Sequence, residues 1–244
     1  ANTEYFVECS ARLKADWGLL DAGYEVAKEQ LYLDQKFEQQ ATALDTGNTL
    51  NYIEANEQLI ISNEDLRFVY DVEKGHCVSY VWQGKELLKD GKGPELNLWR
   101  PLTDNDYGNG MHRKNIAWKY ATSMKEVKAY EVRVVDGQTI ELSQEFWLPA
   151  VETTFEIKYS VHGNGIVQVL SKLSETDHKY DIPRIGMRMQ ISKEYNQLSF
   201  YGRGPWENYQ DRKASSFIDV YHSSVSGQYV PYIRPQENGY KVDT

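Results

Sequence analysis

FEIKYSVHGNGIVQVL, residues 155–170, has the pattern of two strands joined by a short turn. Apolar side chains occupy every second position from residue 155 to residue 161, which is the period of a strand that buries one face. The HGNG segment at 162–165 is rich in turn-forming residues, and a second apolar run follows it. The stretch therefore predicts an antiparallel hairpin, with His162 solvated in the turn.

The same alternation recurs upstream, at residues 5–13 and 66–72. Short clusters of turn-forming residues separate the apolar runs, at 73–76, 83–85 and 136–137. No dozen-residue window repeats apolar residues with a helical period, and only residues 115–120 indicate a short helical turn. We therefore expect an all-β protein built from antiparallel sandwiches.

The composition excludes several classes of partner. The chain has 244 residues, with 27 Lys and Arg against 36 Asp and Glu, so its net charge of -9 does not suit nucleic acid or an anionic membrane. Two cysteines are too few for a disulfide framework, they are not spaced as a metal site, and no apolar run is long enough to cross a bilayer. Aromatic residues make up 13% of the chain, more than a core requires, which indicates an interface or a sugar-stacking surface.

A polar segment at residues 35–58 divides the chain. It contains DTGNT (45–49) among Gln, Glu and Ala, so we interpret it as a linker or irregular crossover. Residues 1–34 hold too few strands for a sandwich and look like the end of a preceding domain, while residues 59–244 form the main β unit. With its loop-like end, the chain is expected to be a piece of a longer protein.

Three loops concentrate polar and aromatic residues. The first, WRPLTDNDYG at 99–108, begins like a calcium loop, because Asp104 and Asp106 stand two positions apart. The match then fails, since Asn109 and Asn115 stand where such a loop has Gly and Glu. A turn braced by Asx hydrogen bonds is therefore favoured over a metal site.

The second loop is YGRGPWENYQDR at 201–212. Glu207 and Asp211 are candidates for a general acid and base, because glycoside hydrolysis needs two carboxylates. Arg203 and Arg212 are available to pair with them, which would lower both pKa values and leave neither as a proton donor. The favoured interpretation is a loop stabilised by ion pairs.

The third loop is YVPYIRPQENGY at 229–240. Two prolines stiffen it, and three hydrogen-bonding side chains at 236–238 lie between Tyr232 and Tyr240. Polar groups flanked by aromatic rings suit a sugar site, and they also describe many ordinary exposed loops. From the residues of this loop alone, both interpretations stay open.

Together the three loops resemble the C-terminal region of glycoside hydrolase family 2 β-galactosidases, in particular the small-chain domain of the LacZ type. The resemblance rests on RPLTDNDYG (100–108), GRGPWENYQDR (202–212), YVPY (229–232) and PQENG (235–239), in this order. The leading ADWGLLDAGYEVAKEQ (15–30) resembles the closing strands of the immunoglobulin-like domain that precedes it in the family. The similarity covers nearly the whole chain.

The resemblance implies an incomplete β-supersandwich of the galactose mutarotase-like type for residues 59–244, and the end of an immunoglobulin-like sandwich for residues 1–34. In the family a separate (β/α)8 barrel carries the two catalytic glutamates, and this chain has no part of that barrel. We therefore expect an accessory piece of an enzyme that hydrolyses terminal non-reducing β-D-galactosides such as lactose, inactive by itself. Its partners would be the barrel and the other domains of the parent, with a galactoside as substrate.

The resemblance also implies roles for individual residues. The third loop would shape the substrate pocket through Gln236, Glu237, Asn238 and Gly239. The other two loops would brace that pocket or the barrel interface through Asp104, Asn105, Asp106, Arg203, Glu207, Asn208, Asp211 and Arg212. No catalytic or metal-binding residue is expected in this chain, although the family commonly uses a divalent cation, Mg or Ca, together with sodium.

Two other functions stay open. An independent carbohydrate-binding module would suit the sandwich and the aromatic content. A mutarotase-like epimerase would need a His and a carboxylate facing one pocket. The sequence is compatible with a soluble protein of the bacterial cytoplasm or periplasm, and with a homo-oligomeric parent.

Overall fold

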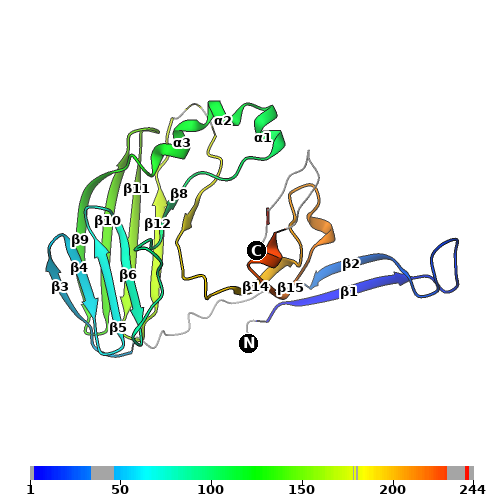
Figure 1. The fold of residues 1–244 in the computed structure, drawn as a ribbon, viewed down its shortest axis with the longest axis horizontal. Coiled ribbons are helices and arrows are strands. Elements are labelled where there is room, and N and C mark those ends of the chain that lie inside the picture. The colour runs from blue at the N-terminus through cyan, green and yellow to red at the C-terminus, as the bar shows by residue number, and fades with distance from the viewer. Residues whose placement is uncertain (1–2, 34–46, 178, 180, 230–239, 242–244) are drawn as a thin grey trace.

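A sandwich of two antiparallel sheets forms the largest part of the structure (Figure 1). The computed structural model describes residues 3–33, 47–177, 179, 181–229 and 240–241. The first sheet has the order β3-β4-β5-β6-β7, with β3 (Asn51–Ala55), β4 (Gln58–Ser62), β5 (Leu66–Asp71), β6 (His76–Trp82) and β7 (Lys85–Glu86). The second has the order β12-β11-β10-β9, with β9 (Glu126–Asp136), β10 (Thr139–Leu148), β11 (Thr153–His162) and β12 (Val167–Leu173).

The hydrophobic core fills the space between these two sheets. The alternate apolar residues that β11 carries at 155–161 are all buried, because they share one face of the strand. Opposite them, the rings of Phe68 and Tyr70 on β5 lie 5.6 and 5.4 Å from the ring of Tyr159. Burial of each such side chain contributes about 1.5–3 kcal/mol. The all-β antiparallel fold expected from the alternation is confirmed.

Polar groups that enter this core are hydrogen-bonded. The Tyr70 hydroxyl donates to the Gln144 side-chain oxygen, and the Gln144 amide donates to the Val72 carbonyl at 2.8 Å. The Tyr159 hydroxyl donates to the Pro94 carbonyl at 2.9 Å. Burial raises the pKa of both tyrosines, so their hydroxyls act as neutral donors that fix the two sheets face to face.

The predicted hairpin turns are present, but the prediction that His162 is solvated is wrong. Its side chain is buried, and ring nitrogen Nδ1 lies 3.1 Å from the hydroxyl of Thr139, its partner across the β10–β11 pair. The turn itself is covered, because Asn63 donates to the Gly163 carbonyl at 2.8 Å and Gly47 pairs with Gly163. A turn that packs under two distant segments has no solvated face for the histidine.

The interpretation of 35–58 as a linker is wrong at its C-terminal end. Residues 51–55 form β3, and the sheet continues through β4. β3 is an edge strand, and all five of its residues are exposed. Because it buries neither face, its sequence shows no alternation of apolar and polar residues. Residues 35–46 lie outside the described part of the chain.

The leading residues form a two-stranded hairpin that extends away from the sandwich (Figure 1). Its strands are β1 (Tyr5–Arg12) and β2 (Glu25–Leu33). Both faces are largely exposed, and Trp17 and Leu19 near its tip are exposed as well. The assignment of residues 1–34 to a preceding immunoglobulin-like domain stays a prediction.

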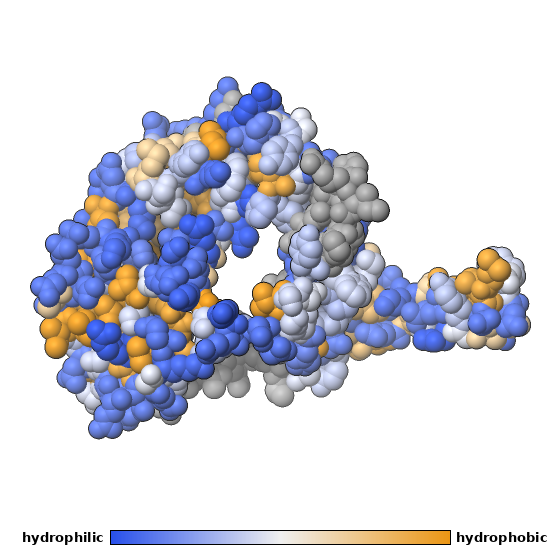
Figure 2. All heavy atoms as spheres, in the orientation of Figure 1, coloured by the Kyte–Doolittle hydropathy of each residue, from blue (hydrophilic) through white to orange (hydrophobic). Residues whose placement is uncertain are grey.

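Within the described residues, three short helices and two further strand pairs complete the fold. They are α1 (Asp104–Gly108), α2 (Met111–Lys114), α3 (Ile116–Ala121), the pair β8 (Glu95–Asn97) with β13 (Gly186–Arg188), and the pair β14 (Gln197–Gly204) with β15 (Phe217–Ser224). Single 3-10 turns occur at Lys213–Ser215 and Ser226–Gln228. Trp118 of α3 is buried and anchors the helices on the sandwich. Figure 2 shows an opening between the sandwich and the β14–β15 ribbon.

Among the described residues, no helix combines the length and the apolar character that crossing a membrane requires. The predicted helical turn at 115–120 corresponds to α3, whereas α1 and α2 have no counterpart in the sequence pattern.

Candidate functional site

The first loop forms helix α1, and its start is capped from both sides. The Thr103 hydroxyl accepts the Asp106 backbone N–H at 3.1 Å, and Asp106 Oδ2 accepts the Thr103 N–H at 3.0 Å. The other carboxylate oxygen of Asp106 accepts from Arg100 Nη2 at 2.9 Å. Asp104 is half-buried and Asn105 is exposed within the same helix. The expected Asx-braced turn is thus a capped helix held by an ion pair.

The second loop follows β14, and ion pairing fixes its shape. Arg212 Nη2 donates to Glu207 Oε1 at 2.9 Å, and the Glu207 side chain is only 4% exposed. Arg203 instead donates to the backbone carbonyls of Ser216 at 2.9 Å and Lys213 at 3.3 Å. The predicted pairing of Glu207 with an arginine is confirmed, while Arg203 holds the following 3-10 turn.

Asp211 and Asn208 have different environments in this loop. Asp211 is exposed at the surface, whereas Asn208 is fully buried. The Asn208 backbone N–H donates to the Tyr240 carbonyl at 2.8 Å, which ties the second loop to the end of the third. Asn208 therefore helps to connect the second and third loops. Only the order of these loops along the chain could be read from the sequence.

All three loops meet at Tyr240. Its ring lies 5.4 Å from the guanidinium carbon of Arg100 and 5.7 Å from the ring of Tyr209. Its hydroxyl donates to the carbonyl of Pro101, next to Arg100 in the chain. Segments near residues 100, 208 and 240 thus form one structure, which we name the Tyr240 junction (Arg100, Pro101, Asp106, Asn208, Tyr209 and Tyr240).

The charges at the junction are compensated. Burial opposes the charge of Arg100, but a hydrogen bond with Tyr209 and the Asp106 carboxylate outweigh it and raise the pKa of the guanidinium. Arg100 is therefore a permanently charged group held between an anion and aromatic rings. Such an arrangement positions loops firmly and offers no proton for acid–base chemistry.

Lys241 extends this structure toward β14. Its ammonium donates to the carbonyls of Pro205 and Trp206, at 3.0 Å each, and lies 4.4 Å above the centre of the Phe200 ring. Burial lowers the pKa of Lys241, and the Glu207 charge partly opposes that effect. Lys241 thus joins the second loop to the residues directly after the third loop.

The β14–β15 ribbon that carries the second loop also binds the leading hairpin. The Gln30 side chain of β2 accepts the Ile218 N–H at 2.8 Å and donates to the Ile218 carbonyl at 3.0 Å, as a neighbouring strand would. The Tyr201 hydroxyl donates to Glu4, and this contact raises the pKa of Tyr201 to about 12. The ribbon is therefore held from both the hairpin and the Tyr240 junction.

The predicted substrate-pocket residues lie outside the described part of the chain. These are Gln236, Glu237, Asn238 and Gly239. Tyr229 before them and Tyr240 after them are described, and only Tyr240 contacts the other two loops among the contacts given above. The role of the PQENG segment stays a prediction.

Sequence reasoning gave no role to Arg100 or Lys241, and it placed Tyr240 beside a possible sugar site and not at the contact between the loops. An arginine three residues before the capping threonine, and an aromatic residue directly after PQENG, were visible signals. Neither indicates a partner, because the contacts join segments that are distant in the chain. Only the fold brings these residues together.

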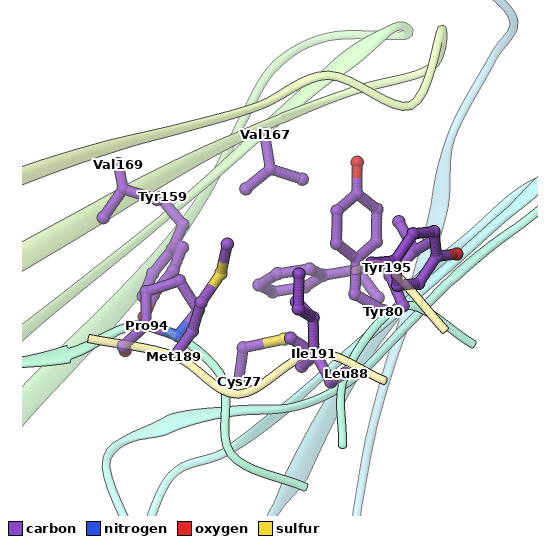
Figure 3. Close-up of a pocket in the computed structure, with 12 residues that line it drawn as sticks. Cys77, Tyr80, Leu88, Pro94, Tyr159, Val167, Val169, Met189, Ile191 and Tyr195 are labelled. Carbon is purple, nitrogen blue, oxygen red and sulfur yellow. The ribbon is translucent and has the colours of Figure 1, made fainter. Parts of the chain in front are cut away.

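No metal centre is formed by the described residues, since none of their His, Cys, Asp and Glu side chains gather in groups of three or more. A cavity of about 380 Å³ does lie at one side of the sandwich, where Figure 3 shows side chains of both sheets and of the 189–195 segment around it. Its lining is almost entirely apolar, and burial raises the pKa of the Cys77 thiol there to about 12. Its one thiol is therefore not a thiolate nucleophile.

Comparison with known proteins gives one consistent family. A family model described as beta galactosidase small chain matches residues 62–244. The chain is 33% identical over 241 residues to a beta-galactosidase of Priestia megaterium, and 30% identical over 256 residues to one of Kluyveromyces lactis. It is 27% identical over 237 residues to a beta-galactosidase of Lactobacillus delbrueckii subsp. bulgaricus.

These matches cover nearly all of this chain but only part of each relative. They cover 98%, 100% and 97% of this chain, respectively, but only 23%, 24% and 23% of the relatives. The chain thus spans about a quarter of the length of the curated relatives that it matches.

Proposed function

Because the chain belongs to the β-galactosidase small chain family, we propose that it is an accessory part of an enzyme that hydrolyses terminal non-reducing β-D-galactosides such as lactose. Its relatives are named as beta-galactosidases, and the chain corresponds to about a quarter of their length. The observation that carries the proposal is the Tyr240 junction, which joins the first two polar, aromatic loops to the end of the third. A surface fixed in this way is suited to support a sugar site that other domains of the parent complete.

The catalytic step belongs to other parts of the parent in this proposal. A retaining hydrolysis needs two carboxyl groups about 5–5.5 Å apart, one of them as a proton donor. The two most prominent acids in the motif loops serve structure instead, since Asp106 caps α1 and Glu207 pairs with Arg212. The chain by itself would therefore be inactive, and the glutamates and metal ions, Mg or Ca with sodium, would be held elsewhere.

The partners follow from the same proposal. The β14–β15 ribbon, the Tyr240 junction and the PQENG segment would face the barrel domain, and Gln236 to Gly239 would reach the galactoside. Trp206 and Tyr107 support this orientation, because both are large aromatic residues of the motif loops and both are exposed. A covered aromatic surface would explain why aromatic residues are concentrated in the loops.

A chimera tests the proposal. The region of the Priestia megaterium beta-galactosidase that aligns with this chain is replaced by the chain, and hydrolysis of o-nitrophenyl-β-galactoside is measured. The enzyme lacking the region and the chain alone serve as controls. We expect activity from the chimera and none from either control. A folded chimera that is as inactive as the deletion would refute the proposed role.

A further inference from the structure

The apolar cavity at the side of the sandwich connects the core with the surface (Figure 3). Its volume of about 380 Å³ is within the range of pockets that enclose a small organic ligand. Among the residues that line it, Phe68 and Tyr159 are buried in the core, whereas Met189 and Ile191 are 57% and 45% exposed. A ligand can therefore enter from solvent and contact core side chains.

The cavity exists because the edges of the two sheets do not meet here. Val169 of β12 pairs with Tyr159 and so shares its core side, yet Val169 is 39% exposed. On the other sheet, β7 has only two residues. The segment after β13 continues that side, since the Lys89 N–H donates to the Gln190 carbonyl at 2.8 Å. The space between β12 and this segment is the mouth of the cavity, because residues of both line it.

The polar groups of the lining already have partners. The hydroxyls of Tyr80 and Tyr159 donate to backbone carbonyls, and so does the thiol of Cys77. The side chain of Tyr195 contacts Lys85. Within the part of the chain that the structure describes, no Asp, Glu, Lys, Arg or His side chain lines the cavity. A charged or polyhydroxy ligand would lose its hydration here without gaining hydrogen bonds in return.

Water is a poor occupant for the same reason, because a buried water molecule needs about two to four polar partners. Apolar cavities without such partners take apolar molecules, and one of about 150 Å³ takes a single benzene ring. The volume here is more than twice as large, so it accommodates two fused rings.

The walls of the cavity favour an aromatic ligand. The ring centre of Phe68 lies 6.4 Å from that of Tyr80 and 5.6 Å from that of Tyr159, and all three rings line the cavity. Aromatic rings at such distances attract one another beyond the effect of the buried area. The thioether of Met189 adds a polarisable sulfur that contacts aromatic rings favourably.

We propose that this cavity binds an uncharged compound with two fused aromatic rings. The rings lie against Phe68, Tyr159 and Met189, and a single polar substituent stays at the mouth in contact with solvent. The affinity comes from the apolar area removed from water and not from hydrogen bonds. The cavity shares no residue with the Tyr240 junction, so this proposal does not depend on the proposed function.

Calorimetric titration of the 244-residue chain with 2-naphthol tests the site, with phenol as the single-ring comparison and inositol as the polyhydroxy comparison. We expect saturable 2-naphthol binding with a Kd of about 0.1 mM, as is reasonable for a ligand of this size. Phenol should bind at least about tenfold more weakly, because it buries less apolar area. Inositol should not bind.

The methyl signals of the methionines locate the ligand. In a nuclear magnetic resonance spectrum of the methyl-labelled chain, the Met189 signal should shift on addition of 2-naphthol, because an aromatic ring lies against that side chain. The Met124 signal should stay unchanged, since Met124 is exposed after α3 and does not line the cavity. Met189→Leu assigns the signal.

Val169→Phe fills the cavity from a partly exposed position and should weaken 2-naphthol binding at least about tenfold. Leu170→Phe is the matched control, because Leu170 is exposed on the opposite face of the same strand, and it should leave the affinity unchanged. Near-UV circular dichroism verifies that each variant is folded. If Val169→Phe does not fold, Met189→Asp decides, since it places a carboxylate at the mouth and should weaken binding to a similar extent.

The proposal is overturned if the folded chain shows no saturable binding of 2-naphthol, if the Met189 signal does not shift, or if Val169→Phe and Leu170→Phe bind alike. Light scattering adds one further outcome against it. A dimer that Met189→Asp dissociates would assign the cavity to a second copy of the chain and not to a small ligand.

Discussion

The guanidinium carbon of Arg100 lies 5.4 Å from the centre of the Tyr240 ring, and the hydroxyl of that ring bonds the carbonyl of Pro101. These contacts join the first motif loop to the end of the third. The Tyr240 carbonyl in turn accepts the backbone N–H of Asn208, which adds the second loop. The segments around Arg100, Asn208 and Tyr240 are thereby held together before any partner binds, so this part of the surface has little freedom left to lose.

Removal of the Arg100 charge should destabilise the chain. The Arg100 and Asp106 side chains are only 20% and 12% exposed, so Arg100→Met leaves a largely buried carboxylate without its cation. We expect a loss of about 2–3 kcal/mol in the free energy of unfolding, below the range for a fully buried pair. Urea unfolding followed by tryptophan fluorescence measures it.

The pair of Arg188 with Glu95, in which the arginine is exposed, provides the control for that measurement. The Arg188 side chain is 63% exposed, and Arg188→Met should cost at most about 1 kcal/mol. Equal effects of the two substitutions would show that Arg100 is not a structural centre of the junction.

Gly163 should not tolerate a side chain. A Cβ atom there would lie 1.7 Å from the carbonyl oxygen of Asn48, which is backbone and cannot move aside easily. Gly163→Ala should therefore cost at least about 2 kcal/mol, as overpacking against backbone does. At Gly108 a Cβ would meet nothing within 4 Å, so Gly108→Ala should change stability by less than about 1 kcal/mol. Thermal unfolding of both variants decides, and similar melting temperatures would contradict the packing of this turn.

The two free cysteines should differ in reactivity. Cys9 is exposed on β1, whereas Cys77 is buried and burial raises its thiol pKa to about 12. At pH 8 a disulfide reagent such as Ellman's reagent should modify one thiol rapidly in the native chain and both in urea. Cys9→Ser should abolish the rapid phase. Rapid modification of two thiols in the folded chain would show that the sandwich opens around β6.

Acid should weaken the chain partly through Glu141. Its carboxylate accepts from Lys158 at 2.7 Å and contacts Arg133, and the Lys158 hydrogen bond, followed by that of Arg133, lowers the Glu141 pKa below 4.5. Because the folded-state pKa is depressed, the stabilisation is complete above pH 4.5 and is lost as pH falls through the lowered value. Glu141→Gln should therefore lose less stability than the unchanged chain between pH 7 and pH 3.

Urea midpoints at pH 7, 5 and 3 check this dependence. Glu145→Gln, on the exposed face of the same strand, is the control and should leave the pH dependence unchanged. If the two variants respond alike, Glu141 does not contribute to the acid sensitivity.

Strands with one buried face were predictable, and strands with none were not. The alternation at 155–161 follows directly from burial of one side of β11, and the structure has that strand. Asn51–Ala55 is an edge strand without a buried side chain, so its sequence looks like a linker. His162 was misjudged because the residues that cover its turn come from positions near 47 and 63.

The candidate site was predictable in its parts but not in its connections. Asp106 and Glu207 each have a partner a few residues away in the sequence. Asp106 pairs with Thr103, and Glu207 pairs with Arg212. The contacts of Tyr240 with Arg100 and Asn208 join distant segments, and no local pattern encodes them. A β-galactosidase function could be expected from the order of the three loops in the sequence. That the loops meet at Tyr240 could be learned only from the fold.

The most direct test substitutes Tyr240 in the chimera that is made from this chain and the Priestia megaterium enzyme. Tyr240→Ala removes the ring that joins the loops, and kcat/KM for o-nitrophenyl-β-galactoside is compared with that of Tyr52→Ala, an exposed tyrosine of β3. We expect the Tyr240 variant to lose at least about tenfold in kcat/KM, equivalent to about 1.4 kcal/mol of transition-state stabilisation, and the Tyr52 variant to keep its activity. An unchanged kcat/KM in a folded Tyr240→Ala chimera would contradict the claim that this junction supports galactoside hydrolysis.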